Sequence, residues 1–306
     1  MFGLRKYNYE SFRRDFALKD LARTKARQMA GPQPGERAPD LEGRTLDGDK
    51  FRLKDLRGES NLVLTFGSAT CPFTAASIQG LNDLYNEYRG EEVDFLFVYV
   101  REAHPGERLP AHTSYAEKVR AAETFREQED VDIPILVDEL DGAIHNKYGG
   151  LPNPSFLIDK SGRVAFRALW TRPKVLREAL EELLTVQAER DTEHAVVHGG
   201  EDTSIPMVHG ILHTHRALER GGRKSVRDYR EQMGRGGRVS ITASWMMEPI
   251  ALHPARAVVG ALLAGGVIFG GLLLGRRLRR ERFGSLREPY TYAPRPGGEG
   301  EYAVGI

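Results

Sequence analysis

Two apolar runs constrain the fold of this chain more than any other feature of its sequence. Residues 62–66 (LVLTF) and 93–100 (VDFLFVYV) have the length of strands and show almost no alternation of polar and apolar side chains. Such runs are typical of strands that are buried on both faces, as in parallel sheets. Residues 75–89 lie between them and carry apolar side chains at helical spacing. Strand, helix and strand in this order predict a parallel pair with a helical crossover.

The surrounding sequence extends this unit to a complete domain at residues 36–185. We expect a hairpin turn at 46–50, a helix at 115–128, a third strand at 133–138, a strand, turn and strand over 155–170, and a closing helix at 173–184. A sheet that combines parallel strands with a hairpin is mixed. The sequence therefore predicts an α/β sandwich with a central mixed sheet.

The segment before this domain, residues 1–35, is predicted to be a basic N-terminal helix that ends in a linker (GPQPG). It lacks the apolar core of a signal peptide. Phe12, Phe16 and Leu21 would lie roughly on one side of the helix. Such a helix either lies on an anionic membrane surface or packs on the domain, and a loose arm is the third alternative.

The segment after the domain, residues 186–256, is polar and rich in histidine. We interpret it as a linker with short helices at 211–219 and 225–233. His209 and His213 stand four residues apart, a spacing that suits a metal ion if the segment is helical. No cysteine or paired carboxylate completes a ligand set, and we therefore predict no metal site.

Residues 257–275 (AVVGALLAGGVIFGGLLLG) carry no charged side chain, and arginines follow at once. A helix of this length reaches about 28 Å, close to the apolar thickness of a bilayer. We predict a single transmembrane helix, with a buried glycine-rich core helix as the alternative. Residues 276–306 form an arginine-rich and then Pro/Gly-rich tail.

The orientation in the membrane follows from two opposing signals. The arginines after residue 275 favour a cytoplasmic tail, which would place the domain outside. The domain has no signal peptide to carry it across, and its free thiol suits a reducing compartment. We expect a single-pass membrane protein with a cytoplasmic domain.

Composition narrows the partners and the compartment. The chain has 44 lysines and arginines against 43 aspartates and glutamates, which argues against a nucleic-acid partner. It has one cysteine, and an intrachain disulfide is therefore excluded. A lone cysteine is either a buried apolar residue or a reactive nucleophile, and its position decides between the two.

Cys71 lies where the first buried strand ends and the helix begins. Residues 67–70 form the bend, and Pro72 suits the first turn of a helix, where its missing N–H costs nothing. A helix N-terminus lowers the pKa of a cysteine, and the thiolate is the nucleophile. Strand, bend, Cys-Pro and helix form a thioredoxin-like arrangement, except that Thr74 stands where a partner cysteine is expected. The predicted fold is therefore a thioredoxin-like sandwich, and an oxidised Cys71 would need an external thiol reductant.

Thioredoxin-like folds place a cis-proline opposite this cysteine, at the start of the following hairpin. Pro154 best matches the spacing to the turn at Gly162, and Pro152 is the alternative. Two ordinary loop prolines are the simpler interpretation, because X-Pro bonds are mostly trans.

The second buried strand ends in residues with acid–base side chains. Tyr99, Glu102 and His104 follow one another at the strand end, the edge where α/β sheets place their sites. A histidine can carry a proton near neutral pH, and a nearby carboxylate can orient it. A solvated loop with an incidental histidine is the alternative.

Three ordered motifs together resemble the iodothyronine deiodinases. They are residues 66–73 (FGSATCPF), 94–105 (DFLFVYVREAHP) and 148–152 (YGGLP). The family has GSCT-Sec-PPF, DFL-I-YI-EEAHP and YG-ALP in the same order. The resemblance covers residues 60–180 approximately and implies a thioredoxin-like fold with no bound cofactor and, in this chain, a cysteine in place of selenocysteine.

The resemblance also implies roles for individual residues. Cys71 falls on the nucleophile of the family, and Tyr99, Glu102 and His104 fall on its proton-handling residues. The residues that it places around the substrate are Ser68, Thr70, His112 and Arg172, to which the expected cis-proline adds Pro154. A homodimer is also implied, because deiodinases pair through their catalytic domains.

The departures from the family limit what can be transferred. Sulfur is a slower nucleophile than selenium, and Ala69 replaces a cysteine that helps to regenerate the enzyme. The segment after His104 is shorter than in the vertebrate enzymes, and the predicted membrane span is C-terminal instead of N-terminal. The chemistry therefore transfers better than the substrate.

Three functions follow from these residues. The first is a deiodinase-like thiol oxidoreductase, in which Cys71 attacks a small molecule such as an iodinated phenol while His104 with Glu102 supplies a proton. The second is a one-cysteine thiol peroxidase that passes through sulfenic acid. The third is a non-catalytic, membrane-tethered binding module that retains the fold.

Overall fold

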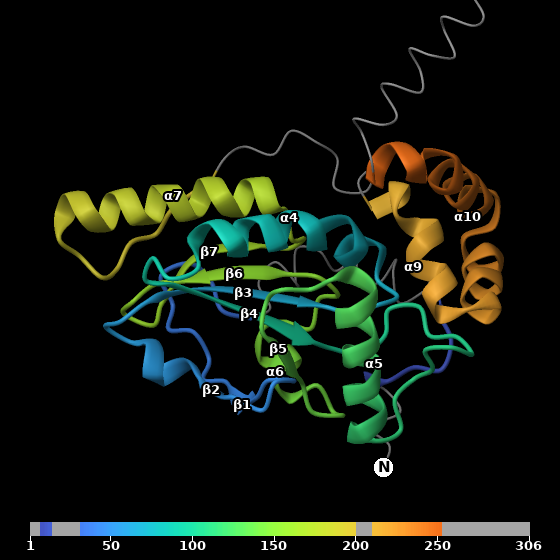
Figure 1. The fold of residues 1–306 in the computed structure, drawn as a ribbon, viewed down its shortest axis with the longest axis horizontal. Coiled ribbons are helices and arrows are strands. Elements are labelled where there is room, and N and C mark those ends of the chain that lie inside the picture. Colours follow the sequence, from blue (N-terminus) through green and yellow to red (C-terminus); the bar gives the residue numbers. More distant parts are fainter. Residues whose placement is uncertain (1–6, 14–30, 200–209, 253–306) are drawn as a thin grey trace, which may run out of the picture. The chain divides into compact units, whose positions relative to one another are not determined.

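The computed structural model describes residues 7–13, 31–199 and 210–252. Their main sheet has five strands in the order β5-β4-β3-β6-β7 (Figure 1). The strands are β3 (Asn61–Gly67), β4 (Val93–Tyr99), β5 (Ile135–Val137), β6 (Ser155–Ile158) and β7 (Val164–Ala168). β3, β4 and β5 are parallel, whereas β6 is antiparallel to both β3 and β7. The predicted mixed sheet is confirmed, and this order is that of a thioredoxin-like fold.

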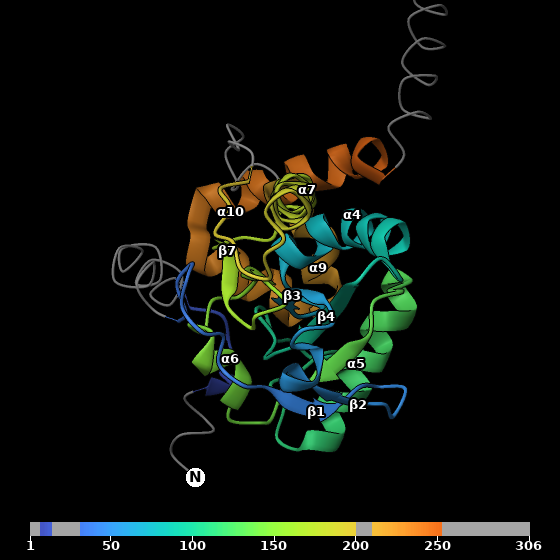
Figure 2. The same cartoon turned by 90° about the vertical axis from the view of Figure 1, so that its left-hand side faces the viewer.

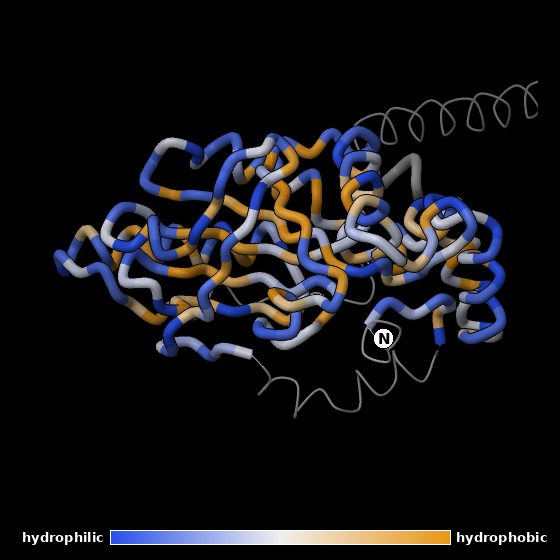
Figure 3. Tube along the Cα trace, turned by 90° about the horizontal axis from the view of Figure 1, so that it is seen from below, coloured by the Kyte–Doolittle hydropathy of each residue, from blue (hydrophilic) through white to orange (hydrophobic). Residues whose placement is uncertain are grey.

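Helices cover one face of the sheet, and a small hairpin and a short helix cover the other (Figures 1 and 2). The first layer holds α4 (Pro72–Tyr88), α5 (Tyr115–Glu129) and α7 (Pro173–Arg190), and the second holds β1 (Glu42–Arg44), β2 (Lys50–Arg52), the 3-10 helix η1 (Leu53–Leu56) and α6 (Ala143–Lys147). Leu62 and Leu64 of β3 belong to one apolar cluster, whereas Val63 belongs to the other. Successive strand side chains point to opposite faces, so a strand between two layers must be apolar throughout. Figure 3 shows hydrophobic segments, in orange, running through the body of the domain with hydrophilic segments around them.

Local sequence signals explain where the helices begin. α4 begins at Pro72, and α5 begins after Ser114, whose hydroxyl accepts a hydrogen bond from the Glu117 N–H at 3.3 Å. The sequence did not predict α6, because five residues are too few for helical periodicity to show. α6 begins after Gly142, which has a φ of 73° and lies against the ring of Tyr7.

The short helices predicted at 211–219 and 225–233 within residues 186–256 correspond to helices of the structure, but these helices are packed elements and not parts of a linker. α7 continues to Arg190, and two further helices follow, α9 (Thr214–Gly221) and α10 (Arg223–Leu252). α9 contacts α4, and its Ala217 and Leu218 are fully buried. Small and apolar side chains on one side of a short helix are enough for it to pack, although the average composition is polar. α10 is interrupted at Gly234, which has a φ of 58°.

Several expectations lie outside the described residues. These are the transmembrane helix at 257–275, the tail at 276–306, His209 and most of the N-terminal helix at 1–35. Within the described ranges, no helix is long and apolar enough to cross a membrane, and no group of three or more His, Cys, Asp or Glu residues could hold a metal ion. The described part of the N-terminus, residues 7–13, packs on the domain through buried Tyr7 and Phe12.

Candidate active site at Cys71

The structure places Cys71 at the junction that the sequence predicted. It is the N-cap residue of α4, four residues after the end of β3, and Pro72 is the first residue of the helix. The Cys71 N–H donates to the Ser68 carbonyl at 3.2 Å, which closes the bend. The Cys71 carbonyl accepts from the Ala75 N–H at 3.0 Å, the first bond of the helix. The side chain is buried, with 1% of the residue exposed.

Burial dominates the electrostatics of the thiol. It raises the pKa of Cys71, because a thiolate loses its hydration inside the protein. Hydrogen bonds from Thr74 and the Phe73 N–H lower the pKa but do not outweigh burial. The pKa of Cys71 is therefore raised by burial and not lowered as the helix N-terminus led us to expect, so the buried thiol is protonated at neutral pH.

Glu102 is the centre of a buried hydrogen-bond network beside the cysteine. Its Oε2 accepts from the Thr70 N–H at 3.0 Å and from the Thr70 hydroxyl at 2.6 Å. Its Oε1 accepts from the Tyr99 hydroxyl and lies 3.5 Å from His112 Nε2. Four residues that the sequence singled out are thus brought together. Thr70 connects them to Cys71, because the two are adjacent in the chain.

The network fixes the protonation of its members. Burial alone raises the pKa of Glu102, but the nearby His112 ring and the hydrogen bonds from Thr70 and Tyr99 outweigh it and lower that pKa overall. Burial raises the pKa of Tyr99 well above its ordinary value, and the Glu102 carboxylate raises it further. The site therefore holds an ionised Glu102 and a neutral phenol.

His104 does not pair with Glu102 as the sequence suggested. Its main-chain N–H donates to Thr70 Oγ1 at 3.0 Å, whereas its ring lies 4.4 Å from the Phe12 ring and 5.4 Å from the Tyr229 ring, centroid to centroid. Its Nδ1 is buried and has no hydrogen-bond partner among the residues that the structure describes. Burial lowers the pKa of His104 to about 3, so the imidazole is neutral. A buried ring nitrogen with no partner is available to a substrate that displaces the aromatic contacts.

The start of the hairpin, where we expected a cis-proline, is joined to the cysteine bend by Asn153. No peptide bond of the described residues is cis, so the prediction for Pro154 is wrong, in agreement with the usual trans preference. The Pro154 carbonyl accepts from the Phe66 N–H at 3.1 Å, and the Asn153 amide nitrogen donates to the Phe66 carbonyl at 3.0 Å. That nitrogen also lies 3.3 Å from the hydroxyl of Thr74. A single asparagine thus connects the hairpin to β3 and to the first turn of α4.

Ser68 and Arg172, two further residues that we predicted to contact the substrate, lie at different places around this network. Ser68 Oγ accepts from the Ala103 N–H at 3.2 Å, which joins the cysteine bend to the loop after β4. Arg172 is the N-cap residue of α7 and follows Thr171, which hydrogen bonds to Asn153. The structure thus places Ser68 in the cysteine bend and Arg172 at the start of α7, next in the chain to the partner of Asn153.

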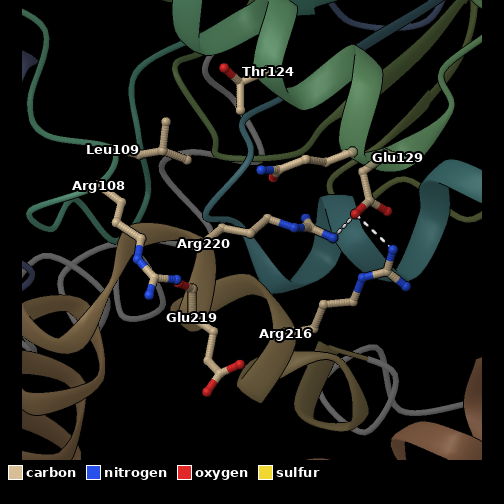
Figure 4. A pocket seen from close by; sticks show the side chains of 8 residues that line it. Arg108, Leu109, Thr124, Glu129, Arg216, Glu219 and Arg220 are labelled. Atoms are coloured by element: carbon tan, nitrogen blue, oxygen red, sulfur yellow. Dashed lines mark hydrogen bonds and ion pairs between the residues drawn. The ribbon is translucent and has the colours of Figure 1, made fainter.

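A pocket of about 430 Å³ lies beside the cysteine bend (Figure 4). Its lining combines arginines and glutamates from the loop after β4, from α5 and from α9: Arg108, Leu109, Thr124, Gln128, Glu129, Arg216, Glu219 and Arg220. Arg220 donates to the Ala69 carbonyl at 3.0 Å, and the buried Glu129 pairs with both Arg216 and Arg220. Figure 4 shows the two guanidinium groups converging on this carboxylate. Sequence reasoning missed these residues because it took α9 for part of a linker.

Residues 7–12, here called the N-terminal strap, cover the site from another side. The Tyr9 hydroxyl donates to the Ala103 carbonyl at 2.8 Å, and the Phe12 ring contacts the His104 ring at a tilt of 49°. Lys224 of α10 donates to the Glu10 carbonyl at 2.7 Å, and the Ser225 hydroxyl donates to the His104 carbonyl. The strap and α10 therefore enclose His104 together. No motif in the sequence indicated this contact.

Comparison with known proteins agrees with the geometry. Residues 34–167 match the AhpC/TSA family. Thyroxine 5-deiodinase of Gallus gallus is 36% identical over 137 residues, which cover 41% of this chain and 52% of the deiodinase. Thiol-disulfide oxidoreductase ResA of Bacillus cereus is 30% identical over 151 residues, which cover 49% of this chain and 76% of ResA. The type I iodothyronine deiodinase of Xenopus laevis is 28% identical over 142 residues, covering 44% of this chain and 55% of that protein.

This chain thus spans about half the length of the deiodinases that it matches. A solved thiol:disulfide interchange protein from Chlorobium tepidum superposes with a TM-score of 0.39 at 17% identity, covering 50% of this chain and 98% of that one. The fold assignment does not depend on that likeness, since the strand order carries it. With the ResA match, the chain belongs to the AhpC/TSA family of thioredoxin-like proteins and is related to the iodothyronine deiodinases.

Proposed function

We propose that the chain is a single-cysteine thiol oxidoreductase in which Cys71 is the nucleophile. The observation that carries the proposal is the pair of hydrogen bonds from Thr70 to Glu102. They connect the residue next to the nucleophile to a buried carboxylate, a phenol and an imidazole, which is the equipment of a proton-transfer site. A thiolate forms when substrate entry opens the site, where the Thr74 and Phe73 hydrogen bonds then favour it.

The substrate class we propose is an iodinated phenol, on the strength of the deiodinase relationship. The Cys71 thiolate takes the iodine from the ring carbon as a sulfenyl iodide, and the carbon receives a proton from the Glu102 network. An external thiol then attacks the Cys71 sulfur, which releases iodide and leaves a mixed disulfide. A second external thiol restores the Cys71 thiol and leaves as a disulfide. The reductant must be external because the chain has one cysteine.

The proton-handling roles differ from those implied by the resemblance. His104 is neutral and turned toward Phe12, whereas His112 lies 3.5 Å from Glu102. We assign proton transfer to Tyr99, Glu102 and His112, and we assign to His104 a contact with the substrate through its unpartnered Nδ1. Arg172 and Ser68 remain proposed substrate contacts.

A non-catalytic binding module is the second candidate, and one observation favours it. Cys71 is 1% exposed and its pKa is raised, as is typical of an inert structural cysteine. A one-cysteine peroxidase uses the same thiol and differs only in its substrate.

Iodide release from a diiodinated phenol by the full chain, with dithiothreitol as the reductant, tests the proposal. We expect release that Cys71→Ser abolishes and Thr70→Val slows, whereas Thr185→Val, an exposed threonine on α7, leaves the rate unchanged. Consumption of peroxide without iodide release would instead assign a peroxidase. If neither reaction occurs, and if iodoacetamide alkylates Cys71 only in denaturant, the chain is a non-catalytic binding module.

A further inference from the structure

The second half of α10 exposes large apolar side chains to the outside of the domain. Val239, Trp245, Met246 and Met247, here called the α10 apolar face, are 68%, 61%, 65% and 38% exposed. They are four of the six exposed large apolar residues found in the described part of the chain. The outward face of a surface helix is normally polar, and clustered exposed apolar side chains mark a contact with a partner or a membrane.

The orientation of this helix is fixed by its opposite side. Ser240, Ile241 and Ser244 are buried against the domain. The Ser244 hydroxyl donates to the Leu212 carbonyl at 2.8 Å and accepts from the His215 N–H at 2.9 Å. Two serines and a single large apolar side chain, Ile241, therefore face inward, whereas Val239, Trp245 and Met246 are more than half exposed. This inversion of the usual pattern cannot be relieved by rotating the helix, because the inward hydrogen bonds would be lost.

The charges on the same stretch are mostly positive. Between residues 235 and 252 the sequence has two arginines, Arg235 and Arg238, and one acidic residue, Glu248. Both arginines are exposed. Apolar side chains flanked by arginine suit the surface of an anionic bilayer, where the guanidinium groups reach phosphate while the apolar side chains enter the acyl boundary.

The position of the α10 apolar face in the chain indicates what covers this face. The uncharged stretch 257–275, long enough to span a bilayer, follows α10 in the sequence, and four arginines lie within residues 276–280. We infer that the α10 apolar face lies in the interface of an anionic membrane and holds the thioredoxin-like domain against it. This inference does not rest on the proposed redox function, since it concerns none of the residues around Cys71.

Tryptophan fluorescence of the full chain in vesicles tests this contact directly. The chain has two tryptophans, and Trp170 is stacked on Phe73, so a Trp170→Phe background reports on Trp245 alone. The vesicles contain phosphatidylcholine with one quarter phosphatidylglycerol, with or without dibrominated acyl chains. An interfacial helix lies about 5–10 Å into the headgroup boundary, within reach of the bromines. We therefore expect the brominated vesicles to quench Trp245.

Two variants separate the helix contact from simple anchoring by residues 257–275. Met246→Glu places a charge in the apolar face and should abolish most of the quenching, while the chain still sediments with the vesicles. Val196→Glu introduces the same charge at an exposed valine outside α10 and should leave the quenching unchanged.

The inference is overturned if Trp245 of the vesicle-bound chain is not quenched, or if the chain does not bind the vesicles. It is also overturned if the Trp245 emission shifts to the blue with protein concentration in the absence of lipid, because a second copy would then cover the face. Equal quenching in Met246→Glu would likewise contradict it.

Discussion

Thr70 connects the nucleophile to its proton network, and threonine suits this position for a physical reason. One hydroxyl both donates to Glu102 and accepts from the His104 N–H, and the main-chain N–H adds a second bond to the same carboxylate oxygen. Valine has the same shape but no hydroxyl. Its introduction would leave Glu102 short of one donor and the His104 N–H without its acceptor.

We expect Thr70→Val to lower the free energy of unfolding by about 1–3 kcal/mol, the cost of leaving buried polar groups unsatisfied. Urea denaturation at neutral pH measures it. The matched variant Thr185→Val removes an exposed hydroxyl that bonds within α7, and it should change the free energy by less than about 0.5 kcal/mol. Equal effects in the two variants would show that the Thr70 bonds contribute nothing specific.

The ring of Phe12 contributes to the burial that lowers the pKa of His104. Burial is the main cause of the lowered His104 pKa, and Phe12 is one of the two aromatic side chains against its ring. Phe12→Ala should admit water and raise the His104 pKa toward its ordinary value of about 6.5, as followed by NMR of the ring protons. Phe51→Ala, at a half-buried phenylalanine of β2, should not move it. An unchanged His104 pKa in Phe12→Ala would mean that the strap does not exclude water.

At the scale of elements, regular segments were predictable and contacts between distant segments were not. β3, β4, α4 and α7 show strong apolar patterns, so their positions follow from the sequence alone. α6 is too short for a pattern. α9 was missed as a packed element because a few buried side chains, such as Ala217 and Leu218, decide its packing.

The candidate site likewise contains residues that the sequence predicted and contacts that it did not. Cys71 follows from the strand–helix junction, and Tyr99 and Glu102 follow from the end of the second buried strand. The resemblance singled out His112 as a substrate contact, but its place beside Glu102 was not predicted. The orientation of His104 depends on Phe12 and Tyr229, which lie far away in the sequence, and the Glu129 pairs depend on α9. Such contacts arise from tertiary packing and leave no periodic signal.

Gly142 sets the position of the N-terminal strap. Its φ is 73°, and an added Cβ would collide with the ring of Tyr7. Gly142→Ala should therefore displace the strap and speed the alkylation of Cys71 by iodoacetamide, measured by mass spectrometry. Gly48→Ala is the control, because Gly48 has a φ of 88° with nothing within 4 Å, so it has the same backbone strain without the collision. Equal alkylation rates in both variants would show that the strap does not limit access to the thiol.

At the scale of the whole molecule, segments from the N-terminal and C-terminal parts of the described chain enclose the side chain of His104. The strap supplies Phe12, and α10 supplies Tyr229 and Ser225, around His104. The enclosed histidine is neutral in the folded protein, with its pKa lowered to about 3, whereas the unfolded chain binds a proton near pH 6.5. Stability thus depends on pH through the uptake of that proton on unfolding.

We expect the free energy of unfolding to decrease as the pH falls from about 6.5 toward 3, because only the unfolded state protonates His104 in this window. Above about pH 6.5 the contribution of His104 is constant. His104→Phe should flatten the dependence between pH 6.5 and 5, where carboxylates change little, as measured by urea denaturation at each pH. The lowered pKa of Glu102 adds a loss of stability at lower pH still. An equally steep dependence in His104→Phe would assign the effect to other groups.

Because the chain has a single, buried cysteine, alkylation of Cys71 also reports how often the site around it opens. Cys71 is the one thiol among 306 residues and is 1% exposed. Every thiol-directed change of mass therefore records an event at one atom, with no second site to subtract. If closure is fast relative to alkylation, the measured rate divided by that of the same thiol in denaturant gives the equilibrium fraction of open molecules. The free energy that separates the closed from the open site is thus accessible from the unlabelled chain.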